Sequence, residues 1–528
     1  FKTGKVTRFE SMFGSMDALE SLNLTHFDVS SGENFDFMFA GNAAMTNLNI
    51  SNWYTPKAKD MNSMFYMMYA LPHLDISHFD TSNVTNMDSM FYEMNALEEL
   101  NVSHFRTSNV TKMGSMFYNV SNVRDLDVSN FDTSNVEDMQ AMFYGMESVE
   151  HLNLSNFDTR KVKNMTRMFR SINAISELDL SNFDTSRVTY MFSMFEGMSN
   201  LTILDLSNFD TSKVTNMSRM FYNMRNLTTL DLSNFDTSMV TNMNAMFAGI
   251  SKLTTLNLSN FNTSNVTDMR SMFSSVSKLT DLNLSSFGTS KVTNMSFMFS
   301  GMSHLTTLDL SNFDTSQVTN MSNMFSTMFS LSSLNVSNFD TSKVTNMDYM
   351  FAYLYSLTSL NLSNFDTSKV ANMSSMFYNS FGFTSLNLSN FDTSNVTNMN
   401  NMFSNMRSLT SLDLSSFNTT NVTDMSSMFS GMAALTSLNI SSFNTENVTD
   451  MNGMFANMSS IESLDLSSFN TKNVIKFRGM FYNDNPNYTL KKIYASADFE
   501  TDKAIANEAT NNEANIDIFH NLMSLEGG

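Results

Sequence analysis

The sequence contains no cysteine, so no disulfide supports the fold. This absence neither proves nor excludes secretion. Proline and tryptophan are almost as scarce, with three and one residues in 528. Only 15% of the residues are charged, yet the formal net charge is −21. Without a basic stripe that could neutralise phosphates, the sequence argues against a nucleic-acid partner. No apolar run approaches the roughly 20 residues of a membrane-spanning helix, so none is predicted.

Methionine and phenylalanine are abundant instead, with 50 and 48 residues. The dipeptide Met-Phe recurs every 26 residues, nineteen times from Phe13 to Phe481, without an insertion or deletion. So narrow a composition with one fixed period indicates a repeat protein. With the Phe of this dipeptide as position 0, the consensus reads LxxLxLSNFDTSxVTNMxxMFxxM.

The apolar positions within each repeat follow two periods. Positions −17 and −15 alternate with polar residues, which is typical of a strand. From −7 to +6 the apolar residues are three or four apart, which is typical of a short helix. Position −12 is Phe throughout, except where Trp53 takes its place. We therefore expect an α/β solenoid like that of leucine-rich repeats, with about nineteen repeats. Each repeat should contribute one short strand to a single parallel sheet and one short helix outside it.

The two ends depart from the repeat. The chain begins at position −12, so we expect that further sequence precedes Phe1. We assign 1–484 to the solenoid, with a partial first unit, and 485–528 to a degenerate C-terminal capping repeat. In the latter Ile493 and Ala495 still indicate a strand, and Phe519 follows Phe481 by 38 residues rather than 26.

These repeats resemble the BspA-like leucine-rich repeats of microbial cell-surface proteins, from Phe1 to Phe481. The resemblance implies a secreted or surface-displayed, non-enzymatic protein, often proposed to take part in adhesion. Many units of that family carry Cys where this chain usually has Met, as at Met94, Met146 and Met198. Cross-linking through thiols is therefore not expected here.

The outward-facing residues of the predicted strand form two polar columns. Position −14 is Ser or Thr, and position −16 is Asp or Asn, in all eighteen units that contain them. The simplest interpretation is an open polar sheet face. Three consecutive aspartates, Asp179, Asp205 and Asp231, offer a second one, because like charges on neighbouring strands repel. Solvent screens them, or their pKa values rise, or a cation such as Ca²⁺ binds among them. No other cofactor is expected.

The same columns create many N-x-[ST] sequons, which would carry glycans in a eukaryotic secretory pathway. Stacked glycans cannot all fit on the sheet, so positions −8 and −5 at the outer edges are the better candidates: Asn109, Asn265 and Asn421 at −8, and Asn216, Asn294 and Asn372 at −5. The methionine columns are interpreted as core filling, since Met packs irregular gaps.

No catalytic constellation stands out, because every candidate Ser or Asp recurs many times. Two non-enzymatic, extracellular functions remain. In the first, the chain is a structural subunit of a filament, coat or appendage, assembled as a homopolymer through its uniform surface. In the second, it is a cell-surface adhesin whose acidic, hydroxyl-rich sheet face binds a glycan or another surface protein. The second predicts that singular residues cluster on that face. The uniform repeat favours the first.

Overall fold

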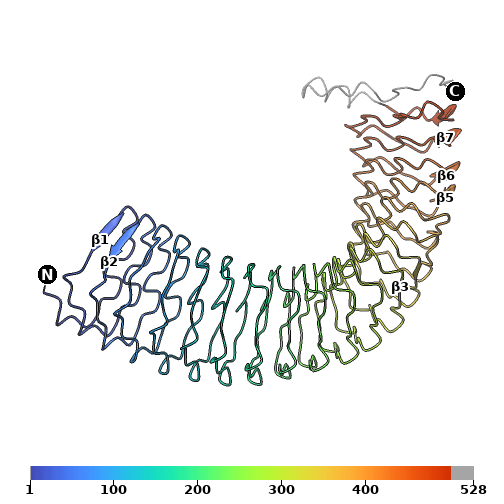
Figure 1. Cartoon of the computed structure of the whole chain (residues 1–528). Helices are drawn as coiled ribbons and strands as arrows, with labels where there is room; N and C mark the ends of the chain where they lie inside the picture. Colours follow the sequence, from blue (N-terminus) through green and yellow to red (C-terminus); the bar gives the residue numbers. More distant parts are fainter. Residues whose placement is uncertain (1, 501–528) are drawn as a thin grey trace. The chain divides into compact units, whose positions relative to one another are not determined.

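The computed structural model describes residues 2–500, which fold as a parallel β-solenoid. The chain forms two compact units, Phe1–Asn265 and Val266–Gly528. In each unit successive repeats stack side by side as turns of the solenoid (Figure 1). Residues 26 apart pair in parallel from one turn to the next, as Asn216 does with Asn242. The predicted 26-residue solenoid is therefore confirmed.

The strands are short and pair two by two in parallel. In the first unit, β1 (Ser21–Asn23) pairs with β2 (Asn47–Asn49). The second unit contains three such pairs: β3 (Thr307–Leu308) with β4 (Ser333–Leu334), β5 (Ser411–Asp413) with β6 (Ser437–Asn439), and β7 (Ser463–Leu466) with β8 (Lys492–Ala495). These strands lie where the sequence predicted them, around position −17. The prediction of one strand per repeat in a single continuous sheet, however, was wrong: residues 2–500 contain eight strands in separate two-stranded sheets, and most repeats have none.

The predicted helix is also wrong, since residues 2–500 contain none. Between −4 and +2, alternate amides bond to the next repeat: Arg219 N–H donates to Asn244 O at 2.8 Å and Asn223 N–H to Ala248 O at 2.8 Å. The amide of Met220 instead closes a turn onto Met217 O. So short a helix would leave most of its terminal amides and carbonyls unbonded, whereas the stacked turns bond them to neighbours. Accordingly, none of the described segments is a helix able to cross a membrane.

The backbone of these turns explains the misleading period. Positions −2 and +2 have positive φ, as at Arg219 (φ 56°) and Asn223 (φ 59°). Positive φ breaks a helix but lets a tight turn close every few residues, so apolar side chains still point inward at spacings of three and four. Position +2 is Gly or Asn in twelve of nineteen repeats, the two residues that tolerate this conformation best. The frequency of Gly and Asn at position +2 could therefore have predicted turns instead of a helix.

A second parallel ladder runs along position −5, which the sequence did not predict. It extends from Arg8 to Asn242 in the first unit and from Asp268 to Lys476 in the second. Its bonds include that from Met217 N–H to Asn242 O, at 3.1 Å. This ladder is continuous within each unit, so it holds neighbouring turns in register more regularly than the short strands do.

The core consists of the predicted apolar columns. Leu204, Leu206, Phe209 and Phe221 are each at most 4% exposed, and Asp205 between the two leucines is exposed. The predicted strand register is therefore confirmed. Phe rings at position 0 stack nearly parallel along each unit, with centroids 5.8 Å apart between adjacent repeats near residue 100. The methionine columns at −4 and −1 are buried beside them, as expected for core filling, except Met12 in the first repeat, which is 47% exposed.

Threonine at position −10 is also buried, which the sequence did not suggest. Thr211 is 1% exposed, and its hydroxyl donates to Asp236 O in the next repeat at 2.8 Å. In the previous repeat, Thr185 Oγ1 accepts from Asp210 N–H at 2.8 Å. A buried hydroxyl is tolerated when it is hydrogen-bonded, and here each one links two turns. The threonine column at −10 therefore links neighbouring repeats by hydrogen bonds, in addition to the ladder at −5.

Near the C-terminal end the spacing between paired residues changes. Strand β8 pairs with β7 at a spacing of 29 residues, Ser463 with Lys492, rather than 26. Ile493 and Ala495 lie in this strand, as expected from the sequence. The rest of the proposed capping repeat, including Phe519, lies outside the described residues.

Candidate functional site

The strand edge of each repeat presents polar side chains in a fixed geometry. At position −16 the side-chain oxygen accepts the backbone N–H of position −14, as Asp205 Oδ1 does from Ser207 at 2.9 Å. This Asx-type turn is available to Asp and Asn alike, which explains why both occur in the column. The outer face is therefore a rigid polar surface whose remaining positions, −19 and −18, vary between repeats.

The calcium candidates Asp179, Asp205 and Asp231 lie exposed on this face, one per repeat. The backbone N–H and hydroxyl of Ser207 hold the pKa of Asp205 below its usual range, against repulsion from Asp179. Hydrogen bonds from Ser233 lower the pKa of Asp231 in the same way. Among the described residues, no group of three or more His, Asp or Glu side chains is placed to hold a metal ion. The charges are thus accommodated by hydrogen bonds, and calcium binding stays a prediction.

These lowered pKa values predict loss of stability in acid. A carboxylate whose pKa is lower in the folded state contributes stability above its unfolded pKa, about 3.9, and loses it as the pH falls through the folded value. Replacing Asp179, Asp205 and Asp231 together by Asn keeps the acceptor oxygen and removes the titration. We expect the melting temperature of this variant, followed by circular dichroism, to fall less than that of the parent chain between pH 5 and pH 2. An identical fall in both proteins would contradict this origin.

The sequon candidates fall into two environments. At position −8 the amide Nδ2 donates to a carbonyl of the preceding repeat, as Asn109 does to Ser82 O at 2.8 Å. At position −5 the side chain is half-buried beside the second ladder, and Asn216 Oδ1 accepts from Ser218 N–H at 2.9 Å. The other four follow their columns: Asn265 and Asn421 at −8, Asn294 and Asn372 at −5. Both sets belong to contacts between or within turns, and their glycosylation stays a prediction.

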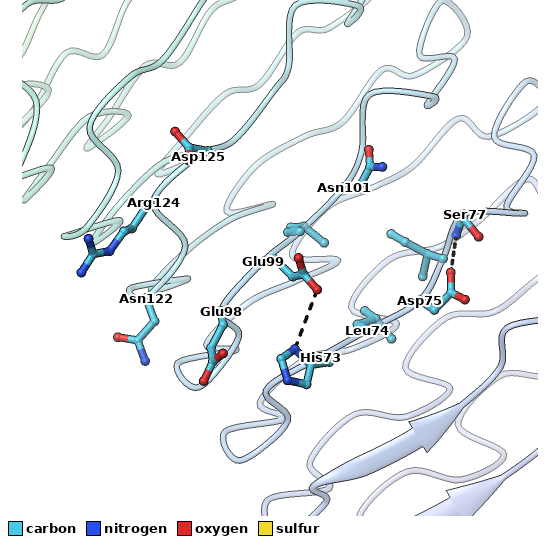
Figure 2. A pocket seen from close by; sticks show the side chains of 12 residues that line it. His73, Leu74, Asp75, Ser77, Glu98, Glu99, Asn101, Asn122, Arg124 and Asp125 are labelled. Carbon is cyan, nitrogen blue, oxygen red and sulfur yellow. Dashed lines mark hydrogen bonds and ion pairs between the residues drawn. The ribbon is translucent and has the colours of Figure 1, made fainter.

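A groove of about 850 Å³ opens on the strand edge of the first unit, across three successive repeats (Figure 2). Its floor is apolar, because Leu74, Ile76 and Leu100 belong to the core columns. Figure 2 shows His73 and Glu99 facing each other across neighbouring repeats, with Nδ1 and Oε1 3.9 Å apart. The groove therefore combines an apolar base with charged walls.

The groove opens where the backbone hydrogen bonds between neighbouring repeats are interrupted. Glu98 N–H donates to Pro72 O at 3.0 Å, and Glu150 N–H donates to Arg124 O at 3.2 Å. Within the described chain, no equivalent bond joins Glu98 to Arg124. Pro72 has no N–H, so it cannot bond in this way to the repeat before it. Pairing two by two thus leaves a gap between Glu98 and Arg124, and the groove lies there.

The walls of the groove belong to a wider surface with unusual composition. Where most repeats of the second unit have Ser or Thr at −19 and −18, four consecutive repeats here each carry at least one exposed carboxylate. We call this surface the charged face: Glu98, Glu99, Arg124, Asp125, Glu150, His151 and Glu177. It holds five carboxylates against one guanidinium. Asp125 and His151 lie side by side as a parallel bridge.

The second unit offers an internal comparison. A smaller groove of about 370 Å³ opens on the same edge, between Ser385 and Ser411, and Asp413 is the one ionisable residue that lines it. It lies between the pair joined from Thr384 to Thr358 and the pair joined from Thr436 to Thr410. Both grooves therefore lie where the backbone bonds between neighbouring repeats are interrupted, whereas the charged walls are particular to the charged face.

Sequence reasoning missed a second singular column, at position +1. Tyr66, Tyr92, Tyr118 and Tyr144 stack with centroids 4.2–4.6 Å apart. Burial among these rings raises the pKa of Tyr92. In the next repeat, the guanidinium of Arg170 lies over the Tyr144 ring at 5.2 Å. The column is visible in the sequence once the repeats are aligned on the Met-Phe dipeptide. Position +1 was not among the apolar positions from which the fold was predicted.

Beyond Arg170 the +1 column continues with Glu196, which is 4% exposed. Its Oε1 pairs with Arg170 at 3.0 Å and with Arg219 at 2.6 Å. Arg219 also lies over the Tyr222 ring at 4.2 Å. The carboxylate and the two guanidinium groups therefore form a largely enclosed network, which is a structural element rather than an open binding site.

Comparison with known proteins gives a family but no activity. The model of the family described as "Mycoplasma protein of unknown function, DUF285" matches eight overlapping segments: 1–99, 42–152, 67–177, 117–226, 147–254, 224–333, 295–412 and 405–518. No curated protein matches the chain.

Several solved leucine-rich repeat structures are similar in part. One from Eubacterium ventriosum is 14% identical over 56% of this chain and 80% of its own, with a TM-score of 0.33. One from Bacteroides ovatus is 12% identical over 83% and 86%, with a TM-score of 0.25. The functional domain of InlJ from Listeria monocytogenes, which includes a cysteine ladder, is 15% identical with a TM-score of 0.20. The similarity spans 76% of this chain and 63% of that domain.

Proposed function

Because this chain belongs to the DUF285 family, whose description assigns no function, we propose one from its surface: a non-enzymatic binding protein whose charged face receives a cationic segment of another protein. The observation that carries the proposal is the concentration of singular residues on one strand edge. That is the pattern expected of a binding face and not of a uniform structural surface. The resemblance to BspA-like proteins supports placing this function outside the cell, as a surface-displayed adhesin.

The chemistry of the charged face favours a partner rich in Lys or Arg. Five carboxylates against one guanidinium attract cations, and such complementarity speeds encounter and selects partners. The apolar floor formed by Leu74, Ile76 and Leu100 suits the methylene stem of a lysine or arginine, which packs on apolar surface while its charge stays at the rim. A glycan without positive charge would leave the carboxylates of this face without partners.

Neutralising the face tests this proposal. In the variant Glu98→Gln, Glu99→Gln, Asp125→Asn, we expect the affinity for an oligolysine peptide, measured by fluorescence anisotropy, to fall at least about tenfold, because close interfacial charge pairs contribute that much. An oligoglutamate peptide should bind to neither protein.

The matched control removes three carboxylates from the same strand edge of the second unit: Asp309→Asn, Asp413→Asn, Asp465→Asn. It changes the net charge equally and should leave oligolysine affinity within about twofold, because surface charges more than a Debye length away are screened. Equal losses in both variants would mean that oligolysine responds only to the net charge of −21, and would overturn the proposal.

A further inference from the structure

A row of cations runs along the first unit at position −8. Lys161, Arg187 and Lys213 occupy this position in three consecutive repeats, and all three are exposed. Lys161 Nζ donates to Asn135 Oδ1 at 2.6 Å, and Lys213 Nζ donates to Ser186 O at 2.9 Å. Both acceptors are neutral and belong to the preceding repeat. The bonds therefore orient the side chains along the stack without cancelling their charge. We call these three residues the basic row.

Nearby cations differ because they have carboxylate partners. Lys163 pairs with Glu137 at 2.7 Å, and Arg160 pairs with Asp158. In the part of the chain that the structure describes, no ion pair within 4.0 Å links a member of the basic row to a carboxylate. Carboxylates lie near the row, since Lys161 and Arg187 contribute to the lowered pKa of Glu137 and Lys213 to that of Asp210. The three neighbouring cations nevertheless stand outside ion-pair distance in a chain with 30 cationic and 51 acidic residues.

The basic row cannot serve the charged face of its own molecule. In the repeats that carry the two surfaces, a buried Phe at −12 and a buried Thr at −10 lie along the chain between position −18 and position −8, as Phe183 and Thr185 do. Among the described residues, no ion pair within 4.0 Å joins the basic row to the charged face, so we expect a contact between them to involve two molecules.

The two surfaces nevertheless match in spacing. The charged face places carboxylates on four consecutive repeats, and the basic row places cations on three. Because both are carried by the same 26-residue turn, their charges advance by the same step along the stack. A second molecule laid alongside can therefore align its three cations with three of the four acidic repeats, which an unrelated polymer would match only by coincidence.

We infer that the cationic partner of the charged face is a second copy of this chain, which contributes Lys161, Arg187 and Lys213. The inference rests on the proposed function, since it names the partner of the same face. Two different surfaces meet, so the contact is heterologous, and each docked copy leaves one surface of each kind available. Contacts of this type that do not close into a ring continue as an open assembly. Such an assembly is the homopolymer, filament or coat that the uniform sequence suggested.

Sedimentation velocity of the purified chain at rising protein concentration tests the inference. We expect self-association at low ionic strength and its loss at high salt, because exposed charge pairs are screened. The variant Lys161→Glu, Arg187→Glu, Lys213→Glu should weaken self-association at least about tenfold. The control Lys291→Glu, Lys343→Glu, Lys369→Glu reverses three cations in the same column of the second unit and should self-associate as the parent does. Circular dichroism checks that each variant folds, and the milder Lys161→Gln, Arg187→Gln, Lys213→Gln replaces any that does not.

Mixing provides the sharper measurement. The basic-row variant keeps an intact charged face, and the variant Glu98→Gln, Glu99→Gln, Asp125→Asn keeps an intact basic row. Neither should self-associate alone, but together they should form a one-to-one complex and no larger species. This result would support the heterologous contact directly.

Different experimental outcomes would contradict the inference and the proposed function. If the parent chain binds oligolysine at the charged face but remains monomeric at every concentration and salt, the second-copy inference is wrong and the proposed function stands. If oligolysine binding does not depend on the charged face, both are wrong. Binding of heparin by the basic row of a monomeric parent chain would assign that row to an acidic polymer and would also overturn the inference.

Discussion

Replacing Phe235 by alanine is expected to lower the free energy of unfolding by about 3–5 kcal/mol, the usual cost of emptying a buried aromatic site. Phe235 is 2% exposed and lies at position −12, with its ring centroid 6.5 Å from that of Phe221 in the preceding repeat. Its ring therefore fills space between two turns. The turns are held at a set distance by the ladder at −5 and by the threonine bonds, so they cannot collapse into the cavity. Urea unfolding followed by circular dichroism measures the loss.

The control lies four residues away. Met239 is 53% exposed at position −8, and Met239→Ala should change the free energy of unfolding by less than about 0.5 kcal/mol. Trp53 shows that the −12 site accepts a larger ring when its polar atom is satisfied, since Nε1 donates to Leu24 O at 3.1 Å. Similar losses for Phe235→Ala and Met239→Ala would mean that the −12 column does not support the stack.

The strand positions and the core could be predicted because burial repeats with the sequence. Alternation at −17 and −15 and the aromatic at −12 each recur in every repeat, and a one-residue error would have exposed Leu204 and buried Asp205. The helix was wrongly predicted because spacings of three and four do not distinguish a helix from consecutive tight turns. The distinguishing residues were Gly and Asn at +2, such as Gly197 and Asn223, whose backbone has positive φ.

The candidate site was predictable in composition but not in shape. Glu98, Glu99 and Asp125 stand out among Ser and Thr once the repeats are aligned, and their exposure follows from the strand register. The groove depends instead on which neighbouring repeats are joined by backbone hydrogen bonds. The repeats differ too little in sequence to predict these bonds, except at Pro72, which lacks an N–H. Threonine at −10 escaped notice because a hydroxyl in a polar segment looks exposed until its partner in the next turn is known.

The second large effect is expected at Glu196. Replacing it by Gln keeps the shape of the side chain but removes the negative charge that holds Arg170 at 3.0 Å and Arg219 at 2.6 Å. Two guanidinium groups would then face each other in a poorly hydrated site, and each would lose its strongest partner. Removing one member of a buried ion pair costs about 3–5 kcal/mol. The side chains of Arg170 and Arg219 retain 24% and 36% exposure, so water recovers part of this and we expect a loss of about 3 kcal/mol.

The carboxylate of Glu137 is the natural control, because it forms a similar pair at the surface. Its Oε2 lies 2.7 Å from Lys163 Nζ, and both side chains are about half exposed. A solvent-exposed pair of this kind contributes little to stability, so Glu137→Gln should be nearly neutral in the same urea titration. Burial, not the number of ion pairs, would then account for the difference. If Glu196→Gln were equally neutral, the two arginines would have to be stabilised mainly by the rings of Tyr144 and Tyr222, and the network would not depend on its carboxylate.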